Sequence, residues 1–482
     1  MKIRIVLLVL GVLLLVESIF MLFSAIIAII YGENDILALS LSAGFTAIAG
    51  SLLYLLNKNV PRQVGKKEAY LIVTLGWIFL SFFGTIPYIF NGYIPSFTNA
   101  FFETISGFTT TGASILNNIE ELPHGILFWR SITQWMGGMG IIVLSIAVLP
   151  LIKVGGMQLF AAEVPGPTKD KIHPKIKETA KRLWLIYFVL TIVETILLKL
   201  GGMNWFDAVC HSLTTMSTGG YSTKQASIAY FTSPYIHYTI SFFMLIAGTN
   251  FILIYFISKG KLRKVWQNDE FLYYLKIIIL SVIIISISLI VWMNIPTELA
   301  IRDSVFQVIS ILTTTGFCTT DYLLWQPAGL WVILLLLMFV GGMAGSTAGG
   351  IKIVRIQLLL RNSYSEFKRL LHPNAIIPVR YNKKSINSNI INNIQAFVIL
   401  YLFIFFISSL IMSMMGLDFS SAVGAVAASL GNIGPGIGSV GPIENYAHIP
   451  IAGKWFLSFL MLLGRLELFT VLMIVAPGFW KN

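Results

Sequence analysis

Thr109-Thr110-Thr111-Gly112-Ala113 is the stretch that decides the fold, because three further segments of the chain resemble it. The other copies are Met216-Ser217-Thr218-Gly219-Gly220, Thr313-Thr314-Thr315-Gly316-Phe317 and the weaker Gly431-Asn432-Ile433-Gly434-Pro435. If the glycines at 112, 219, 316 and 434 are equivalent, they are 107, 97 and 118 residues apart. Each copy lies between two long apolar segments, as expected of an internal repeat. The pattern predicts four helix–loop–helix units around one axis, with a glycine-containing loop from each unit meeting there.

Glycine at the same place in all four loops has a physical reason. Successive carbonyl groups point toward one axis only if the backbone alternates between left- and right-handed conformations, and glycine adopts positive φ without steric cost. A ring of such carbonyls can replace the water shell of K⁺. Thr111, Thr218 and Thr315 can add oxygen atoms, whereas Ile433 leaves the fourth unit with backbone oxygen alone. The predicted K⁺ filter consists of Thr110, Thr111, Gly112, Thr218, Gly219, Thr314, Thr315, Gly316, Asn432, Ile433 and Gly434.

The composition indicates a protein whose solvent is lipid. Mean hydropathy is +0.82, and 56% of the residues are hydrophobic while 11% are charged. A soluble domain has about 25% charged residues, so an ordinary soluble enzyme is excluded. A secretory signal peptide is the alternative interpretation of residues 2–31, but their apolar run of about 26 residues is too long for one. We expect a retained first transmembrane helix.

The net charge of +12 is concentrated on one side of the expected membrane spans. Most of the 33 lysine and arginine residues lie in loops that the helix count places together. The exceptions are Arg130, Lys199, Lys224, Arg302, Lys454 and Arg465. Cytoplasmic loops of membrane proteins carry such an excess of basic residues. The distribution predicts that both termini are cytoplasmic, and it explains the charge without nucleic acid as a partner.

The long apolar segments predict an all-α integral membrane protein in five parts. Two N-terminal helices, at 5–30 and 36–56, carry no copy of the filter segment and belong to a domain over 1–60. The four pseudo-symmetric pore repeats are expected over 61–155, 156–260, 261–390 and 391–482. Because about 20 residues cross a membrane as a helix, the second helices of repeats one, two and four are predicted to be continuous. Their expected ranges are 125–149, 235–258 and 455–477.

The second helix of repeat three is interrupted. Its apolar run, 330–340, spans only about 16 Å as a helix, and the following segment 341–350 contains five glycines. Non-helical backbone at membrane depth persists only where protein or a water-filled cavity receives its polar groups. We predict that this segment lines the pore below the filter as a gate; the alternative is a glycine-lined helix crossing. The expected gate residues are Gly341, Gly342, Gly345, Ser346, Thr347, Gly349, Gly350 and Arg465.

Arg465 lies in the middle of the last apolar helix and must face protein or water. Two hypotheses remain open: a positive charge in the cavity that couples to segment 341–350, or one partner of a structural ion pair. For Arg130 and Gln134, which share one helix face, structural hydrogen bonding is favoured. The acids that we expect to cap half-helices, rather than to attract cations, are Asp207, Asp303 and Asp418.

Signatures of enzymes are missing from the sequence. Segment 341–350 lacks the Lys-Ser/Thr of a P-loop, and neither paired carboxylates nor His/Cys ligand spacings occur. Cys210 and Cys318 cannot form a metal site by themselves and are expected to be small buried thiols. The chain is therefore predicted to have no catalytic residue and no organic cofactor, with K⁺ as the transported ion.

The four predicted filter segments, segment 341–350 and the pair Gly464-Arg465 resemble the TrkH/KtrB superfamily of potassium transporters, over essentially the whole chain. The length and the two extra N-terminal helices resemble its TrkH branch. The resemblance implies a homodimer, each protomer with its own pore, in a bacterial or archaeal cytoplasmic membrane. It also implies a cytoplasmic regulatory ring of nucleotide-binding Rossmann domains, of the TrkA or KtrA type, that moves segment 341–350.

The resemblance also assigns meaning to particular residues. The basic segments Lys153–Arg182 and Lys352–Lys384 are candidate docking surfaces for the ring, although ordinary positive-inside charge explains individual lysines equally well. Gly112 implies a preference for K⁺, because plant relatives that favour Na⁺ often carry serine at this filter position.

The expected function is potassium uptake through a gated, channel-like pore driven by the membrane potential. The alternative is a K⁺/H⁺ or K⁺/Na⁺ symporter on the same scaffold, which needs a titratable group near the ion path. Glu17, Glu103, Glu194 and Glu467 are the candidates, and for Glu17 a structural role is equally compatible with the sequence. A third hypothesis is a membrane receptor or assembly subunit that transports nothing.

Overall fold

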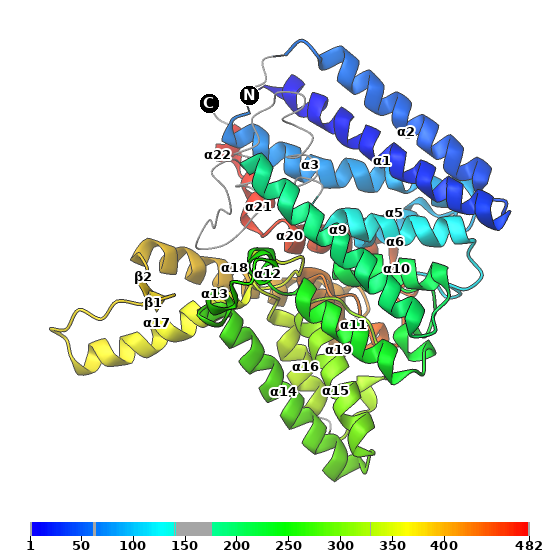
Figure 1. Ribbon diagram of the computed structural model, residues 1–482. Helices are drawn as coiled ribbons and strands as arrows, with labels where there is room; N and C mark the ends of the chain where they lie inside the picture. Colours follow the sequence, from blue (N-terminus) through cyan, green and yellow to red (C-terminus); the bar gives the residue numbers. More distant parts are fainter. Residues whose placement is uncertain (1, 61–63, 139, 141–175, 328, 481–482) are drawn as a thin grey trace.

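The computed structural model describes residues 2–60, 64–138, 140, 176–327 and 329–480. The only strands in these residues are the short hairpin of β1 (Arg380–Tyr381) and β2 (Lys384–Ser385). Within the same ranges, six helices are long and apolar enough to cross a membrane, or up to eight if two bent pairs are each one span. The predicted all-α membrane class is confirmed (Figure 1).

The N-terminal pair, α1 (Ile3–Tyr31) and α2 (Ile36–Asn57), forms a helical hairpin beside the first repeat (Figure 1). The two helices approach closely at a pair of glycines. A Cβ atom added to Gly11 would lie 2.7 Å from the carbonyl oxygen of Gly50, and one added to Gly50 would lie 2.9 Å from that of Gly11. Small residues permit such backbone approach between membrane helices.

Four repeats follow, each with a first helix, a half-helix that ends at a glycine turn, and a second membrane segment. Repeat one contains α3 (Lys66–Gly84), α4 (Ile86–Phe90), α5 (Phe97–Phe108) and α6 (His124–Gly138). Repeat two contains α9 (Ile176–Leu200), α10 (Trp205–Met216), η1 (Ser227–Tyr230), α11 (Pro234–Ala247) and α12 (Phe251–Ser258), and α13 (Leu262–Trp266) connects it to repeat three. Repeat three contains α14 (Asp269–Met293), α15 (Thr297–Leu312), η2 (Tyr322–Leu324), α16 (Gly329–Phe339) and α17 (Ile353–Leu371). Repeat four contains α18 (Ser388–Met414), α19 (Phe419–Gly431), η3 (Gly438–Val440), α20 (Ile451–Arg465), α21 (Phe469–Val475) and α22 (Pro477–Trp480).

Two second helices that we predicted to be continuous are broken. The predicted helix 235–258 bends by 107° between α11 and α12, and the predicted helix 455–477 bends by 119° between α20 and α21. At the first break, the side chain of Asn250 caps the new helix α12. At the second, Glu467 has a φ of +53°, a conformation that a right-handed helix does not contain. The part of the predicted helix 125–149 beyond Gly138 lies, apart from residue 140, outside the described residues.

Residues 340–352, which we call the glycine loop, separate α16 from α17 and are not helical. The loop returns to its starting point, because the N–H of Gly341 donates to the carbonyl of Ile351 at 2.8 Å. It also uses a carbonyl that the α11–α12 break leaves free: the N–H of Met343 donates to Gly248 at 2.9 Å. The alternative of a continuous glycine-lined helix crossing is therefore wrong.

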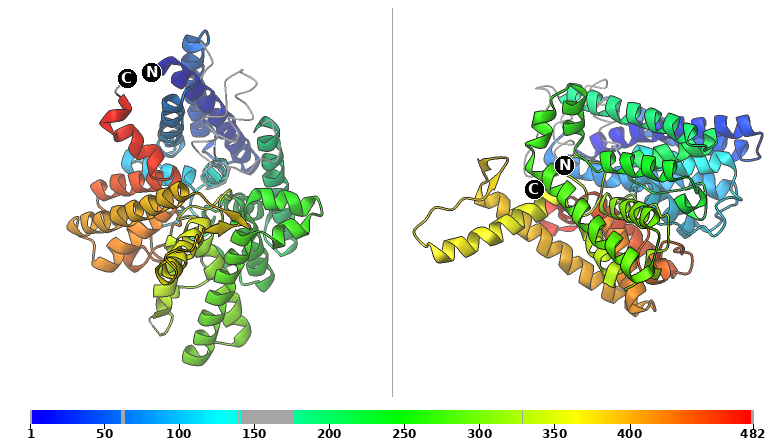
Figure 2. Two further views of the ribbon diagram at one scale, coloured as in Figure 1. Left: turned by 90° about the vertical axis from the view of Figure 1, so that its left-hand side faces the viewer. Right: turned by 60° about the horizontal axis from the view of Figure 1, so that its bottom comes forward.

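The helix α17 and the β1–β2 hairpin project away from the helix bundle, on the side of the molecule at which both termini lie (Figure 1). The right-hand view of Figure 2 shows the same projection. The first turns of α17 are buried, whereas the rest of the helix exposes Leu360, Phe367 and Leu370. We call residues 353–385 the projecting module.

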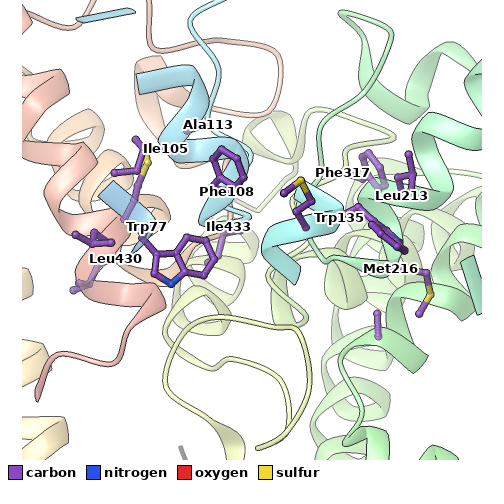
Figure 3. Packing of buried hydrophobic residues seen from close by; sticks show 14 of the residues in the cluster. Trp77, Ile105, Phe108, Ala113, Trp135, Leu213, Met216, Phe317, Leu430 and Ile433 are labelled. Carbon is purple, nitrogen blue, oxygen red and sulfur yellow. The ribbon is translucent and has the colours of Figure 1, made fainter. Parts of the chain in front are cut away.

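Most of the buried hydrophobic residues form one cluster that runs through all four repeats and the N-terminal pair. Figure 3 shows a part of it that includes Phe108 of α5, Trp135 of α6 and Met216 of α10. Cys210 and Cys318 are free and buried, as the sequence predicted. The half-helices are thus fixed by the same core that holds the membrane helices.

Candidate functional site

The four glycine turns share one backbone conformation. We number their residues as positions 1 to 4 from the end of each half-helix. Position 2 has positive φ of 53°, 53°, 57° and 54° at Thr110, Thr218, Thr314 and Asn432. Position 4 has positive φ of 81°, 78°, 82° and 95° at Gly112, Gly220, Gly316 and Gly434. The handedness therefore alternates along every turn, as carbonyls that point in one direction require.

The hydrogen bonds that end the half-helices are also equivalent. In each turn, the N–H of position 2 donates to the carbonyl three residues earlier. The N–H of position 3 donates to the carbonyl five residues earlier. All eight bonds measure between 2.8 and 3.3 Å. Four segments with different side chains are thus folded by the same local pattern.

This equivalence corrects the predicted alignment of the second turn. Gly220, not Gly219, has the positive φ of the other three glycines. Gly219 takes position 3, where the other turns have Thr111, Thr315 and Ile433. The two adjacent glycines made the register ambiguous in the sequence. Ser217 and Tyr221, which align with Thr109 and Phe317, were the signal that could have resolved it.

The four turns form a closed ring. A Cβ atom added to the position-4 glycine of one turn would meet the position-3 carbonyl oxygen of the next turn. A Cβ on Gly112 would clash with the carbonyl oxygen of Gly219. In the same way, a Cβ on Gly220 would clash with that of Thr315, and a Cβ on Gly316 with that of Ile433. The ring closes at the fourth turn, where a Cβ on Gly434 would lie 2.8 Å from the carbonyl oxygen of Thr111. Because the same contact recurs from turn to turn, the turns surround a common axis.

Side chains behind the ring hold its backbone. The Gln134 amide donates from Nε2 to the carbonyl of Gly219 at 2.7 Å and accepts the N–H of Tyr221 at 3.0 Å. In the fourth turn, the Tyr446 hydroxyl donates to the carbonyl of Gly434 at 2.7 Å. These buried bonds fix the direction of carbonyls that are otherwise free of helical partners.

The position-3 threonine hydroxyls have protein partners. The hydroxyls of Thr109 and Thr111 lie 2.8 Å apart, as do those of Thr313 and Thr315. The Thr111 hydroxyl also accepts Nδ2 of Asn432 at 2.9 Å, which links the fourth turn to the first. The absence of a hydroxyl at Ile433 therefore removes a side-chain support rather than a backbone oxygen of the ring.

A buried ion pair supports the outer end of the first two turns, that is, the side on which the chain leaves each turn. Arg130 Nε donates to Glu103 Oε1 at 2.7 Å, with Glu103 0% and Arg130 2% exposed. Glu103 also accepts the hydroxyl of Ser114, just after the first turn, and Arg130 donates to the carbonyl of Ser222, just after the second. Structural hydrogen bonding was the favoured prediction for Arg130 and Gln134, and it is confirmed. The partnership of Arg130 with Glu103 was not predicted.

Replacing Arg130 should destabilise the fold strongly. Arg130→Leu leaves the Glu103 carboxylate buried without its counter-charge, a change that costs about 3–5 kcal/mol. Thermal unfolding of the purified protein in detergent measures this effect. Arg302→Leu is the control, because Arg302 lies 3.6 Å from Glu298, which is largely exposed, and such a pair is worth about 0–1 kcal/mol. Equal unfolding temperatures for the two variants would contradict this supporting role.

The three acids expected to cap half-helices differ in their positions. Asp418 caps α19, because it accepts the N–H of Ser421 at 3.2 Å, and hydrogen bonds from neighbouring serines lower its pKa to about 2. Asp207 lies in the first turn of α10, but the cap is Asn204. Asp303 lies within α15, which begins at Thr297, so its predicted capping role is wrong.

The glycine loop contacts the inner end of the ring, by which we mean the side on which the half-helices end. The N–H of Gly349 donates to the position-2 hydroxyl of Thr314 at 2.7 Å. The hydroxyl of Thr347 lies 3.2 Å from the carbonyl oxygen of Met216, at the end of α10, and 3.1 Å from that of Ala247. Through these side chains the loop contacts repeat two as well as the turn of its own repeat.

The other predicted gate residues shape the loop. Gly345 and Gly350 have positive φ, of 77° and 65°. The Ser346 hydroxyl closes a local turn by donating to the carbonyl of Met343 at 2.6 Å. Neither Gly341 nor Gly342 has room for a side chain, because an added Cβ would meet loop atoms.

Arg465 bridges the ring and the loop. Its Nη1 atom lies 3.1 Å from the Thr110 hydroxyl and 2.8 Å from the carbonyl oxygen of Thr347. Its Nη2 atom lies 2.6 Å from the carbonyl oxygen of Gly137 in α6. Arg465 thus contacts both the first glycine turn and the glycine loop.

The nearby acid Glu467 pairs with another arginine. Arg355, in the first turn of α17, donates to the Glu467 carboxylate and lies 3.9 Å from the centre of the Phe397 ring. This pair connects the α20–α21 break to the segment that follows the glycine loop.

Two acids of the membrane helices are buried away from any basic residue of an ion pair. Glu17 on α1 and Glu194 on α9 are each 0% exposed. Within the part of the chain that the structure describes, the Glu17 carboxylate has no hydrogen-bond partner, whereas Glu194 lies next to the hydroxyl of Thr215. The other two acids considered for coupled transport, Glu103 and Glu467, each pair with an arginine.

Comparison with known proteins finds relatives that match this chain along its whole length. The family model TrkH, described as a cation transport protein, matches residues 38–481. A Trk system potassium uptake protein TrkH of Escherichia coli K12 is 42% identical over 480 residues, which cover 98% of each chain. One from Halomonas elongata is 39% identical over 486 residues, covering 100% of each. The crystal structure of the potassium transporter TrkH from Vibrio parahaemolyticus is 36% identical, with a TM-score of 0.90 and 100% coverage of both chains. The chain belongs to the TrkH family of cation transport proteins.

Proposed function

We propose that this protein takes up potassium across the cytoplasmic membrane through a channel-like pore whose filter is the ring of four glycine turns. The observation that carries the proposal is the closed ring, in which each position-4 glycine lies against the position-3 carbonyl of the next turn. The names of the relatives, potassium uptake proteins and a potassium transporter, support K⁺ as the ion. The filter comprises positions 2 to 4, with Gly220 added to the residues predicted from the sequence.

The pore needs no chemical energy source in this proposal. An inward cation gains about 2.3 kcal/mol per elementary charge for each 100 mV of membrane potential. The half-helices α5, α10, α15 and α19 all end at the ring. The negative ends of their dipoles lie close to the cation, which favours its dehydration there.

The glycine loop and Arg465 form the gate of this pore. The loop contacts the inner end of the ring through Gly349 and Thr347, and Arg465 touches both structures. A positive charge next to Thr110 opposes the passage of a cation. Opening therefore requires the loop and Arg465 to move together.

Replacing Arg465 should raise the flux. Arg465→Ala removes the positive charge and the bonds to Thr110 and Thr347, so we expect K⁺ flux in proteoliposomes to rise by about tenfold, equivalent to 1.4 kcal/mol. The control is Lys454→Ala on the same helix, since Lys454 is a buried cation that bonds Asn99 and Ala447 outside the ring. A loss of stability with unchanged flux would assign Arg465 a purely structural role.

The proposed assembly is a homodimer in a bacterial or archaeal inner membrane, with both termini in the cytoplasm and a TrkA- or KtrA-type ring docked below. The projecting module supports this orientation, because it extends on the side of both termini and contains most of the basic segment Lys352–Lys384. Of the other basic segment, Lys153–Arg182, the part before residue 176 lies outside the described residues.

A K⁺/H⁺ or K⁺/Na⁺ symporter is the second candidate. The observation in its favour is that Glu17 and Glu194 are fully buried in membrane helices, and that Glu17 has no hydrogen-bond partner among the described residues. Such groups in membrane helices mark proton or ion pathways in many transporters.

One experiment separates these functions. Purified protein is reconstituted in liposomes, and K⁺ flux is measured under a membrane potential with the proton and Na⁺ gradients clamped to zero. The channel-like proposal expects K⁺ flux that exceeds Na⁺ flux and follows the potential alone. Protons or Na⁺ that move in a fixed proportion to K⁺ would establish symport, because a symporter carries its coupling ion even when the potential alone drives the flux. No flux under any condition would favour a non-transporting subunit.

A further inference from the structure

The helix α14 begins with two adjacent acids, Asp269 and Glu270. Acids in the first helical turn face the positive end of the helix dipole, and this alone would explain an exposed pair. Glu270, however, is only 2% exposed. A buried carboxylate requires hydrogen-bond donors from the surrounding protein. The donors to Glu270 therefore show which segments of the chain are attached to it.

The donors to Glu270 come from two segments that are far apart in sequence. Oε1 accepts the backbone N–H of Ala344 at 2.7 Å, and Oε2 accepts the hydroxyl of Tyr381 at 3.3 Å. Ala344 belongs to the glycine loop, and Tyr381 belongs to β1 of the projecting module. One carboxylate therefore joins the loop to the module.

Asp269 attaches the same helix start to the module. Its Oδ2 atom accepts Nη1 of Arg361 at 2.7 Å and the N–H of Asn382 at 3.0 Å. Its own N–H donates to Oδ1 of Asn382 at 2.9 Å, and its carbonyl accepts Nε2 of Gln357 at 3.0 Å. The first turn of α14, α17 and the hairpin are thus connected by several bonds within a short span.

A buried cation stabilises the fold of the glycine loop itself. Lys352 is 7% exposed, and its ammonium group donates to the carbonyl of Ala348, so this bond joins two residues of the loop. Ser346 and Thr347 lie between Ala344 and this bond, with Thr347 in contact with the end of α10. Because hydrogen bonds to charged groups are about twice as strong as neutral ones, the bond from the Ala344 N–H to the Glu270 carboxylate is a strong attachment of the loop to α14.

We propose that Glu270 is a positioning residue for the gate: it holds the glycine loop against the inner end of the ring and transmits movements of the projecting module to it. A displacement of the hairpin pulls on Tyr381, weakens the Ala344 bond and frees the loop. The inference rests on the proposed function of the glycine loop as the gate, and it adds a physical connection from the loop to a surface that a partner can reach.

The primary test is K⁺ flux through Glu270→Ala in proteoliposomes without any partner protein. We expect flux to rise by about tenfold, equivalent to 1.4 kcal/mol, with the K⁺/Na⁺ flux ratio unchanged because the ring is intact. Glu270→Gln keeps a carbonyl oxygen in place to accept the Ala344 N–H, so it should restore most of the low flux. A general folding defect would produce neither the unchanged ratio nor the rescue.

Tyr381→Phe provides a second, milder variant. It removes only the hydroxyl that Glu270 accepts, so flux should rise less than in Glu270→Ala. In the Glu270→Ala background, it should have no further effect, because both substitutions break the same connection. The control is Tyr364→Phe, which removes an exposed hydroxyl from α17 of the same module. Wild-type flux in both Glu270→Ala and Tyr381→Phe would overturn the proposal.

Deletion of residues 345–349 distinguishes this inference from the gate proposal itself. If the deletion raises flux while Glu270→Ala does not, the loop is a gate that Glu270 does not position. If neither variant raises flux, the gate proposal fails and the inference fails with it.

Discussion

Gly112→Ser is expected to reduce the discrimination of K⁺ over Na⁺ by about tenfold, equivalent to 1.4 kcal/mol of differential stabilisation. Gly112 has a φ of +81° and no room for a Cβ atom, which would clash with the carbonyl oxygen of Gly219. The serine must either move that carbonyl or leave the left-handed conformation. Both changes alter the cage of oxygen atoms around a dehydrated cation.

The measurement is the ratio of K⁺ to Na⁺ flux in proteoliposomes. Gly92→Ser is a matched control, because Gly92 also has positive φ, of +76°, but has no atom within 4 Å of an added Cβ. It reproduces the backbone strain outside the ring. An unchanged ratio in a folded Gly112→Ser protein would contradict the assignment of the filter.

Deleting residues 345–349 is expected to raise K⁺ flux by about tenfold or more, a shift of at least 1.4 kcal/mol in the opening equilibrium. The deletion removes Thr347 and Gly349, which carry the contacts of the glycine loop with Met216 and Thr314. It leaves the four turns and their supports, including Gln134, unchanged. Selectivity should therefore stay at its wild-type value while the rate increases.

Flux of the deletion variant is measured together with its elution as a single folded species in detergent. Ser346→Ala serves as the control, because it changes only the local bond between Ser346 and Met343 within the loop. Flux that is unaltered or lowered in folded deletion protein would refute the gate proposal.

The repeats, the membrane class and the position of the glycine loop could be predicted because each has a local signal in the sequence. Apolar length predicts a span, and glycines in an apolar stretch predict an interruption. Thr-Thr-Gly after a short segment predicts the turn. These signals depend on neighbouring residues, which a single sequence displays directly.

The breaks at α11–α12 and α20–α21 were missed because apolar length alone was used. Gly248-Thr249-Asn250 combines a poor helix former with a helix cap and could have indicated the first break. At the second, Glu467 pairs with Arg355, a residue more than a hundred positions away. A long-range charge partner of this kind leaves no local pattern.

The supports of the ring were also beyond local inference. Glu103 and Arg130 are separated by a turn and a loop, and their pairing follows only from the packing of α5 against α6. Likewise, the second turn contains two candidate glycines, and only the backbone conformation distinguishes Gly220 from Gly219. Tertiary structure decided both cases.

The order of contacts around the ring gives it a direction of rotation. A Cβ atom added to Gly112 would meet a carbonyl of the second turn, one on Gly220 would meet the third, one on Gly316 the fourth, and one on Gly434 the first. A side chain introduced at one of these position-4 glycines will consequently lie nearest to the oxygen supplied by the next turn. The disturbance should therefore spread in one direction around the ring, and the turn that follows the substituted one should be displaced the most.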